Sequence, residues 1–107
     1  MYLEDMINSM ERIIEYIHGL SYENIQLDQK TIDAVVRNFE IIGEATKNIP
    51  DIVKNKYPDI PWRAMYSLRN RISHEYFGID FELIWDIAQN HLPMNLIQVK
   101  SIISEIK

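Results

Sequence analysis

The sequence contains no cysteine among its 107 residues and only three glycines and four prolines. The absence of cysteine excludes disulfides and thiol chemistry, and it fits a reducing compartment. The scarcity of glycine and proline permits long helices. No apolar run reaches membrane-spanning length, and residues 1–5 lack the basic region of a signal peptide. We therefore expect a soluble, cytoplasmic protein.

Positive charge is also scarce, because 11 basic residues face 16 acidic ones and the net charge is −5. This balance argues against a broad nucleic-acid-binding surface. The charge is unevenly distributed, however. Residues 1–28 hold six acids and one base, whereas residues 51–76 hold five bases and three acids. The basic segment indicates either a local pocket for an anion or an ordinary solvated face.

Apolar residues make up 47% of the chain, which is enough for the core of one domain covering residues 1–107. They recur at helical spacing in several segments. The predicted helices are residues 3–18, a helix capped by Asp28 or Thr31 that ends near Asn48, residues 62–77, a helix capped by Asp80, and residues 95–106. We predict a connection at 20–28 and at most a short helical turn at 51–57.

Four or five helices with short connections predict an all-α, up-and-down bundle. Pro61 suits the first turn of the third long helix, Gly78 its end, and Pro93 a kink or break. We interpret Trp62 and Trp85 as core residues. The first, second and last helices carry apolar faces that are wide for so small a protein, so we expect a homodimer.

The segment 68–78 concentrates hydrogen-bonding side chains in about two and a half helical turns. On a helical projection, one side carries the apolar residues Ala64, Met65, Leu68 and Ile72. The opposite side is polar, and its members are Arg63, Arg69, Asn70, Ser73, His74 and Tyr76. Asn70 and His74 are four residues apart and can touch, whereas Tyr76 falls about 20° from Arg69.

These residue types suit phosphate chemistry. Arginine offers a fork of donors to phosphate oxygens, and histidine exchanges protons near neutral pH. RNA carries a 2′-hydroxyl beside each phosphate, so an enzyme with both groups needs no metal to cleave it. No metal-ligand cluster, phosphate-binding glycine loop or nucleophile elbow stands out in the sequence. The alternative is a surface helix whose arginines pair with the acids of residues 3–18.

The same segment resembles the Arg-x4-His-x-Tyr signature of the HepT family, a branch of the HEPN ribonucleases. The signature residues are Arg69, His74 and Tyr76. Further pieces match in the same order, and the resemblance covers roughly residues 1–105. These pieces are Glu40-Ile41-Ile42-Gly43-Glu44-Ala45, Pro61-Trp62, and Tyr76-Phe77-Gly78-Ile79-Asp80 followed by Trp85.

The resemblance implies a HEPN-like helical bundle that dimerises around a cleft and acts as the toxin of a toxin–antitoxin pair. The activity it implies is metal-independent endoribonuclease activity, with no cofactor. Arg69 and His74 match the catalytic residues of the family, and Asn70 matches a polar position beside the arginine. Tyr76 matches the tyrosine that the partner antitoxin, a minimal nucleotidyltransferase called MntA, modifies by AMPylation.

Arg71 and Ser73 are further candidates for contact with the RNA substrate. Two other readings stay open. In one, the polar face of 62–77 binds a nucleotide or the antitoxin without catalysis, which the acidic net charge favours. In the other, the chain is a purely structural helical dimer, and neither Arg69 nor His74 affects binding or activity.

Overall fold

The computed structural model describes the backbone of residues 2–74 and 81–106, and the side chains in these ranges outside 69–74. Within them it contains seven helices and no strand, which confirms the all-α prediction. The helices are α1 (Tyr2–Ile17), α2 (Tyr22–Gln26), α3 (Gln29–Lys47), α4 (Asp51–Lys56), α5 (Trp62–His74), α6 (Phe81–Asn90) and α7 (Leu92–Ile106). The helix α5 begins where it was predicted to begin, while the predicted Gly78 end and Asp80 cap lie outside the described residues.

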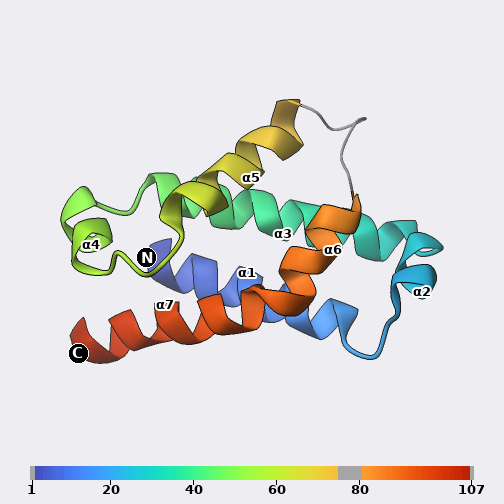
Figure 1. Ribbon diagram of the computed structural model, residues 1–107, viewed down its shortest axis with the longest axis horizontal. Helices are drawn as coiled ribbons and strands as arrows, with labels where there is room; N and C mark the ends of the chain where they lie inside the picture. The colour runs from blue at the N-terminus through green and yellow to red at the C-terminus, as the bar shows by residue number, and fades with distance from the viewer. Residues whose placement is uncertain (1, 75–80, 107) are drawn as a thin grey trace.

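The long helix α3 occupies the centre of the bundle (Figure 1). It packs most extensively against α1 on one side and α5 on another, and α7 packs against α1. The chain runs in opposite directions along α1 and α3, and again along α3 and α5 (Figure 1). The predicted up-and-down arrangement is therefore confirmed, and α3 supports the helix that carries the candidate site.

The core follows the apolar stripes of the sequence. On α1 and α3 the predicted stripes are buried, with the exception of a few half-buried members at their edges. Thr46 of α3 is 1% exposed and donates a hydrogen bond to the Ile42 carbonyl oxygen at 2.8 Å. Its hydroxyl also lies 3.9 Å from the sulfur of Met6 and 4.0 Å from the sulfur of Met65. This small side chain thus sits where α1, α3 and α5 meet.

Local signals set the ends of the first helices. Gly19 adopts φ +79°, a left-handed conformation that ends α1. The segment 20–28 is not a simple connection as predicted, because Ser21 and Asn24 form a capping box that starts α2. Asp28 caps α3 as predicted and accepts hydrogen bonds from the side chain and backbone of Thr31. These bonds lower the pKa of Asp28.

The junction of α6 and α7 differs from the prediction. The last helix begins at Leu92 and not at residue 95, so only His91 separates it from α6. Pro93 lies in the first turn of α7, where no intrahelical donor is needed. The His91 backbone nitrogen donates to the Ile87 carbonyl at 3.0 Å, and the Asn95 nitrogen donates to the His91 carbonyl at 3.1 Å.

The two tryptophans differ in burial. Trp62 is 8% exposed, as predicted for a core residue. Trp85 is only half-buried and packs at the edge of the core, with its ring centroid 6.2 Å from that of Tyr22. Met94 and Ile97 remain well exposed on α7. The predicted homodimer stays a prediction.

None of the described helices combines the length and the apolar character needed to cross a bilayer.

Candidate active site

The helix α5 carries five of the six predicted site residues on its backbone. Arg69, Asn70, Arg71, Ser73 and His74 occupy its C-terminal half, where the structure describes the backbone alone. The sixth residue, Tyr76, lies outside the described residues. One continuous helix therefore sets the spacing of the five positions, and their chemical roles remain predictions.

The start of α5 is held by Trp62. The Trp62 indole nitrogen donates to the Tyr57 carbonyl oxygen at 3.1 Å, and its backbone nitrogen donates to the Ile60 carbonyl at 2.8 Å. The Met65 nitrogen then donates to the Pro61 carbonyl at 3.1 Å. These bonds fold residues 57–61 tightly against the first turn of α5 and fix the direction in which the helix leaves the bundle.

The connection of residues 57–61, which precedes Trp62, is also bonded to the last helix. The Tyr57 hydroxyl hydrogen-bonds to the Glu105 carboxylate near the end of α7. This bond raises the pKa of Tyr57. The bond joins the segment after α4 to α7. The last helix therefore also helps to position the segment from which α5 begins.

The predicted division of α5 into two sides is tested only for residues 62–68, because Ile72 and the polar residues from Arg69 onward lie outside the described side chains. Met65 and Leu68 are half-buried against the core, whereas Arg63 and Tyr66 are exposed. Ala64 was assigned to the apolar side but is exposed, and it lines a hollow in the surface of the described core. The alternative interpretation, in which the arginines pair with the acids of α1, does not hold for Arg63 in the described part of the chain.

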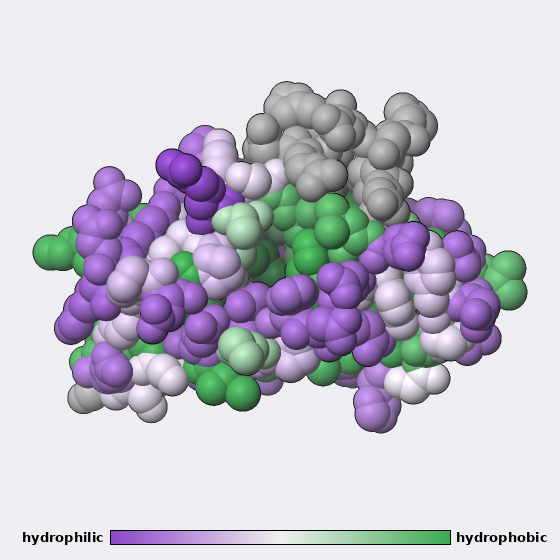
Figure 2. Space-filling model, in the orientation of Figure 1, coloured by the Kyte–Doolittle hydropathy of each residue, from purple (hydrophilic) through white to green (hydrophobic). Residues whose placement is uncertain are grey.

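The hollow beside Ala64 has a volume of 260 Å³ and lies between α5 and the junction of α6 and α7. Figure 2 shows apolar residues at its base in the middle of this face. His91 stands at its rim, 3.7 Å from the Asp86 carboxylate. His91 could not be recognised from the sequence as a residue that lines a pocket, because it lies at a helix junction and not in a motif. The mostly apolar lining does not suit a phosphate.

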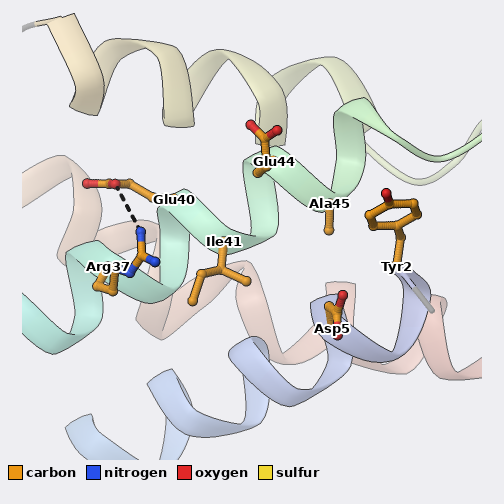
Figure 3. Close-up of a pocket in the computed structure, with 7 residues that line it drawn as sticks. All are labelled: Tyr2, Asp5, Arg37, Glu40, Ile41, Glu44 and Ala45. Carbon is orange, nitrogen blue, oxygen red and sulfur yellow. Dashed lines mark ion pairs between the residues drawn. The ribbon is translucent and has the colours of Figure 1, made fainter.

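A second pocket, of 320 Å³, lies between α1 and α3. Figure 3 shows the Asp5, Glu40 and Glu44 carboxylates around it, with Arg37 paired to Glu40 at 3.8 Å. The charged residues that line this pocket are mostly acidic, which disfavours a polyanion. The pocket therefore does not attract nucleic acid electrostatically, and the basic side of α5 remains the better candidate for a nucleic-acid site.

Among the described side chains, those of residues 2–68 and 81–106, no three histidine or acidic groups lie closely enough together to hold a metal ion.

Comparison with known proteins identifies the family. A model of the family described as ribonuclease HepT-like matches residues 6–102. The chain belongs to the HepT-like ribonuclease family. The match includes all of α3 and α5, and therefore both the central helix and the helix with the Arg69–His74 positions.

Several relatives of the HepT-like chain match over most of its length. A protein of Methanocaldococcus jannaschii, provisionally named an RNase, is 41% identical over 106 residues, which cover 99% of this chain and 88% of the relative. One of Thermococcus cleftensis, provisionally named ribonuclease HepT, is 42% identical over 92 residues, covering 86% and 84%. One of Caldanaerobacter subterraneus subsp. tengcongensis, provisionally named an RNase, is 37% identical, covering 99% and 95%. No solved structure matches significantly.

Proposed function

We propose that this chain is a metal-independent endoribonuclease and the toxin of a toxin–antitoxin pair. The observation that supports the proposal best is the placement of Arg69 and His74 on one helix of a HepT-like ribonuclease. The names of the relatives agree, because each includes RNase or ribonuclease. The substrate is RNA.

In the proposed reaction the 2′-oxygen of one nucleotide attacks the adjacent phosphorus while the bond from phosphorus to the 5′-oxygen breaks. The 2′-hydroxyl loses a proton and the leaving 5′-oxygen gains one. His74 carries out one of these proton transfers and water the other. Arg69 binds the phosphate and stabilises the charge that develops on its oxygens. Asn70, one turn before His74, holds the imidazole in one tautomer, and Arg71 and Ser73 contact the substrate.

The experiment that tests this proposal is RNA cleavage by purified protein, expressed without any antitoxin, in the presence of a chelator. We expect cleavage of single-stranded RNA, with products that end in a cyclic phosphate. A failure of the unmodified protein to cleave any of several RNAs would contradict the proposal. It would favour a second candidate, a non-catalytic nucleotide- or antitoxin-binding module, which the net charge of −5 supports.

We further propose that an MntA-like nucleotidyltransferase neutralises the toxin by AMPylation of Tyr76. The tyrosine oxygen attacks the α-phosphorus of ATP, pyrophosphate leaves, and the phenolic proton passes to solvent. On the helical register predicted from the sequence, Tyr76 lies on the side of Arg69. The added phosphate would occupy the place of the RNA phosphate and offset the arginine charge.

The antitoxin proposal predicts that Tyr76→Phe escapes neutralisation. With ATP and the nucleotidyltransferase present, we expect wild-type cleavage to stop and a mass increase of one or more AMP groups to appear. The Tyr76→Phe protein should keep its cleavage and its mass. Tyr66→Phe, an exposed tyrosine on the same helix, is the matched control and should be neutralised like wild type. Equal neutralisation of Tyr76→Phe and wild type would exclude this role of Tyr76.

A further inference from the structure

A groove of 680 Å³ lies beside the first half of α5. It shares no lining residue with the acidic pocket, and it borders the apolar hollow at Pro61 and Ala64. Three elements form it: the end of α3, the helix α4 with the connection that follows, and the start of α5. Its cationic and polar lining residues are Lys47, Lys54, Asn55, Arg63 and Tyr66, together with one acid, Asp51.

The groove is basic although the protein is acidic. Lys47 is in the last turn of α3, Lys54 is in the last turn of α4, and Arg63 is the second residue of α5. With the described side chains, those of residues 2–68 and 81–106, none of the three forms an ion pair. Three unpaired cations against Asp51 give a local positive potential in a chain whose net charge is −5. The fold thus gathers basic residues that are separated in the sequence.

The groove also offers a platform for a base. Tyr66 is 37% exposed, which leaves an aromatic surface accessible at the groove wall. Proteins that bind single-stranded nucleic acid combine a positive groove for the backbone with aromatic rings on which bases stack. The Asn55 amide, also exposed, lines the same groove and adds hydrogen-bonding capacity to it.

The groove is aligned with the predicted catalytic positions. Positions 63, 66, 70 and 74 follow one another at intervals of three, four and four residues. These spacings place all four positions along one side of the α5 helix. Positions 63 and 70 are about 10 Å apart along the axis. A strand held at positions 69–74 that continues toward the start of α5 therefore runs into the groove.

We propose that this groove is a binding subsite for the single-stranded RNA that flanks the cleaved phosphate. Lys47, Lys54 and Arg63 bind backbone phosphates, and Tyr66 stacks on a base. The subsite rests on the proposed ribonuclease function. It extends the proposed RNA-binding site from the cleaved phosphate alone to the adjacent single-stranded RNA. It explains how an acidic protein holds RNA, because binding is confined to one basic track.

Binding measurements test the subsite independently of cleavage. The probe is a fluorescently labelled, fully 2′-O-methylated single-stranded RNA, which lacks the attacking hydroxyl and is not cleaved. For Lys47→Gln, Lys54→Gln and Arg63→Gln we expect about fivefold weaker binding each at 0.1 M salt, and a salt slope reduced by about 0.7 for each lost contact. Tyr66→Ala should weaken binding without changing the slope.

Lys30→Gln is the matched control, because Lys30 is an exposed lysine in the first turn of α3, at the other end of that helix from Lys47. It should bind as wild type does. Circular dichroism melts verify that each variant is folded. Unchanged affinity and slope in all three groove variants, or an equal loss in Lys30→Gln, would overturn the subsite. Equal affinity of the groove for AMP alone and for the strand would also overturn it, because a strand gains from several contacts.

Cleavage kinetics separate the two proposals. If wild type cleaves RNA, the groove variants should raise KM with kcat nearly unchanged, whereas His74→Ala should lower kcat. Cleavage with KM unaffected in the groove variants overturns the subsite and leaves the ribonuclease proposal intact. Absence of cleavage by wild type, with RNA binding that depends on the groove, overturns the catalytic proposal alone and keeps the subsite.

Discussion

Purified Arg69→Ala and His74→Ala proteins should lose nearly all RNA cleavage while staying folded. General acid–base catalysis contributes about 10²–10⁴-fold, which is the loss we expect for His74→Ala. Removal of one group that stabilises developing charge costs about 10²–10³-fold, which we expect for Arg69→Ala. The rates are measured in single-turnover assays with a chelator present, so that binding and product release do not obscure the chemical step.

The chain supplies matched controls for both substitutions. Arg12 and His18 are exposed residues on or just after α1, outside the candidate site. Arg12→Ala and His18→Ala should cleave at the wild-type rate. Arg69→Lys separates charge from geometry, because lysine keeps the charge but cannot bind a phosphate through a planar fork. Full cleavage by His74→Ala would show that the acid or base is another residue.

Replacement of Trp62 by alanine should be the most damaging single change to stability. Truncation of a buried tryptophan typically costs about 3–5 kcal/mol. That is a large share of the roughly 5–15 kcal/mol that stabilises an ordinary domain. Trp62 also fixes the 57–61 connection to α5 through its hydrogen bond to the Tyr57 carbonyl oxygen. The measurement is the free energy of unfolding in a urea titration followed by circular dichroism.

Two variants divide this effect into its parts. Trp62→Phe keeps most of the buried ring but removes the indole donor, so that the Tyr57 carbonyl oxygen keeps only the Ile60 backbone N–H. We expect a loss of about 1 kcal/mol from the missing hydrogen bond. Trp85→Ala removes a half-buried ring and should cost less than Trp62→Ala. A Trp62→Ala protein as stable as wild type would mean that α5 is held by α3 alone.

The long helices were predictable because their signals are local. Apolar spacing located α1 and α3, and the Asp28 cap and the Pro61 boundary depend on neighbouring residues only. The same reasoning missed α2, because its capping box joins Ser21 and Asn24 in a segment that was too short to show periodicity. The predicted start of the last helix, residue 95, was too late, because Pro93 was interpreted as a break. A proline in the first turn of a helix disrupts no intrahelical hydrogen bond, so α7 can begin before it.

For the candidate site too, some residues can be recognised in the sequence and others cannot. The positions from Arg69 to His74 could be predicted because they share one helix and one motif, and their roles stay predictions. Lys47 and Lys54 were not, because each is an ordinary surface lysine in the sequence, and only the turn through α4 brings them near Arg63. Ala64 was assigned to the wrong environment for a related reason: a helical projection gives direction but does not show whether a neighbour fills the space.

Because a single residue separates α6 from α7, this junction limits where relatives in the family can gain or lose residues. One inserted residue within a helical junction turns the following helix by about 100° and advances it by about 1.5 Å. An insertion at His91 would therefore rotate Val99 and Ile102, both fully buried, out of the core. Relatives that differ in length should carry their insertions and deletions at residues 18–21, and the spacing between Trp85 and Val99 should stay constant.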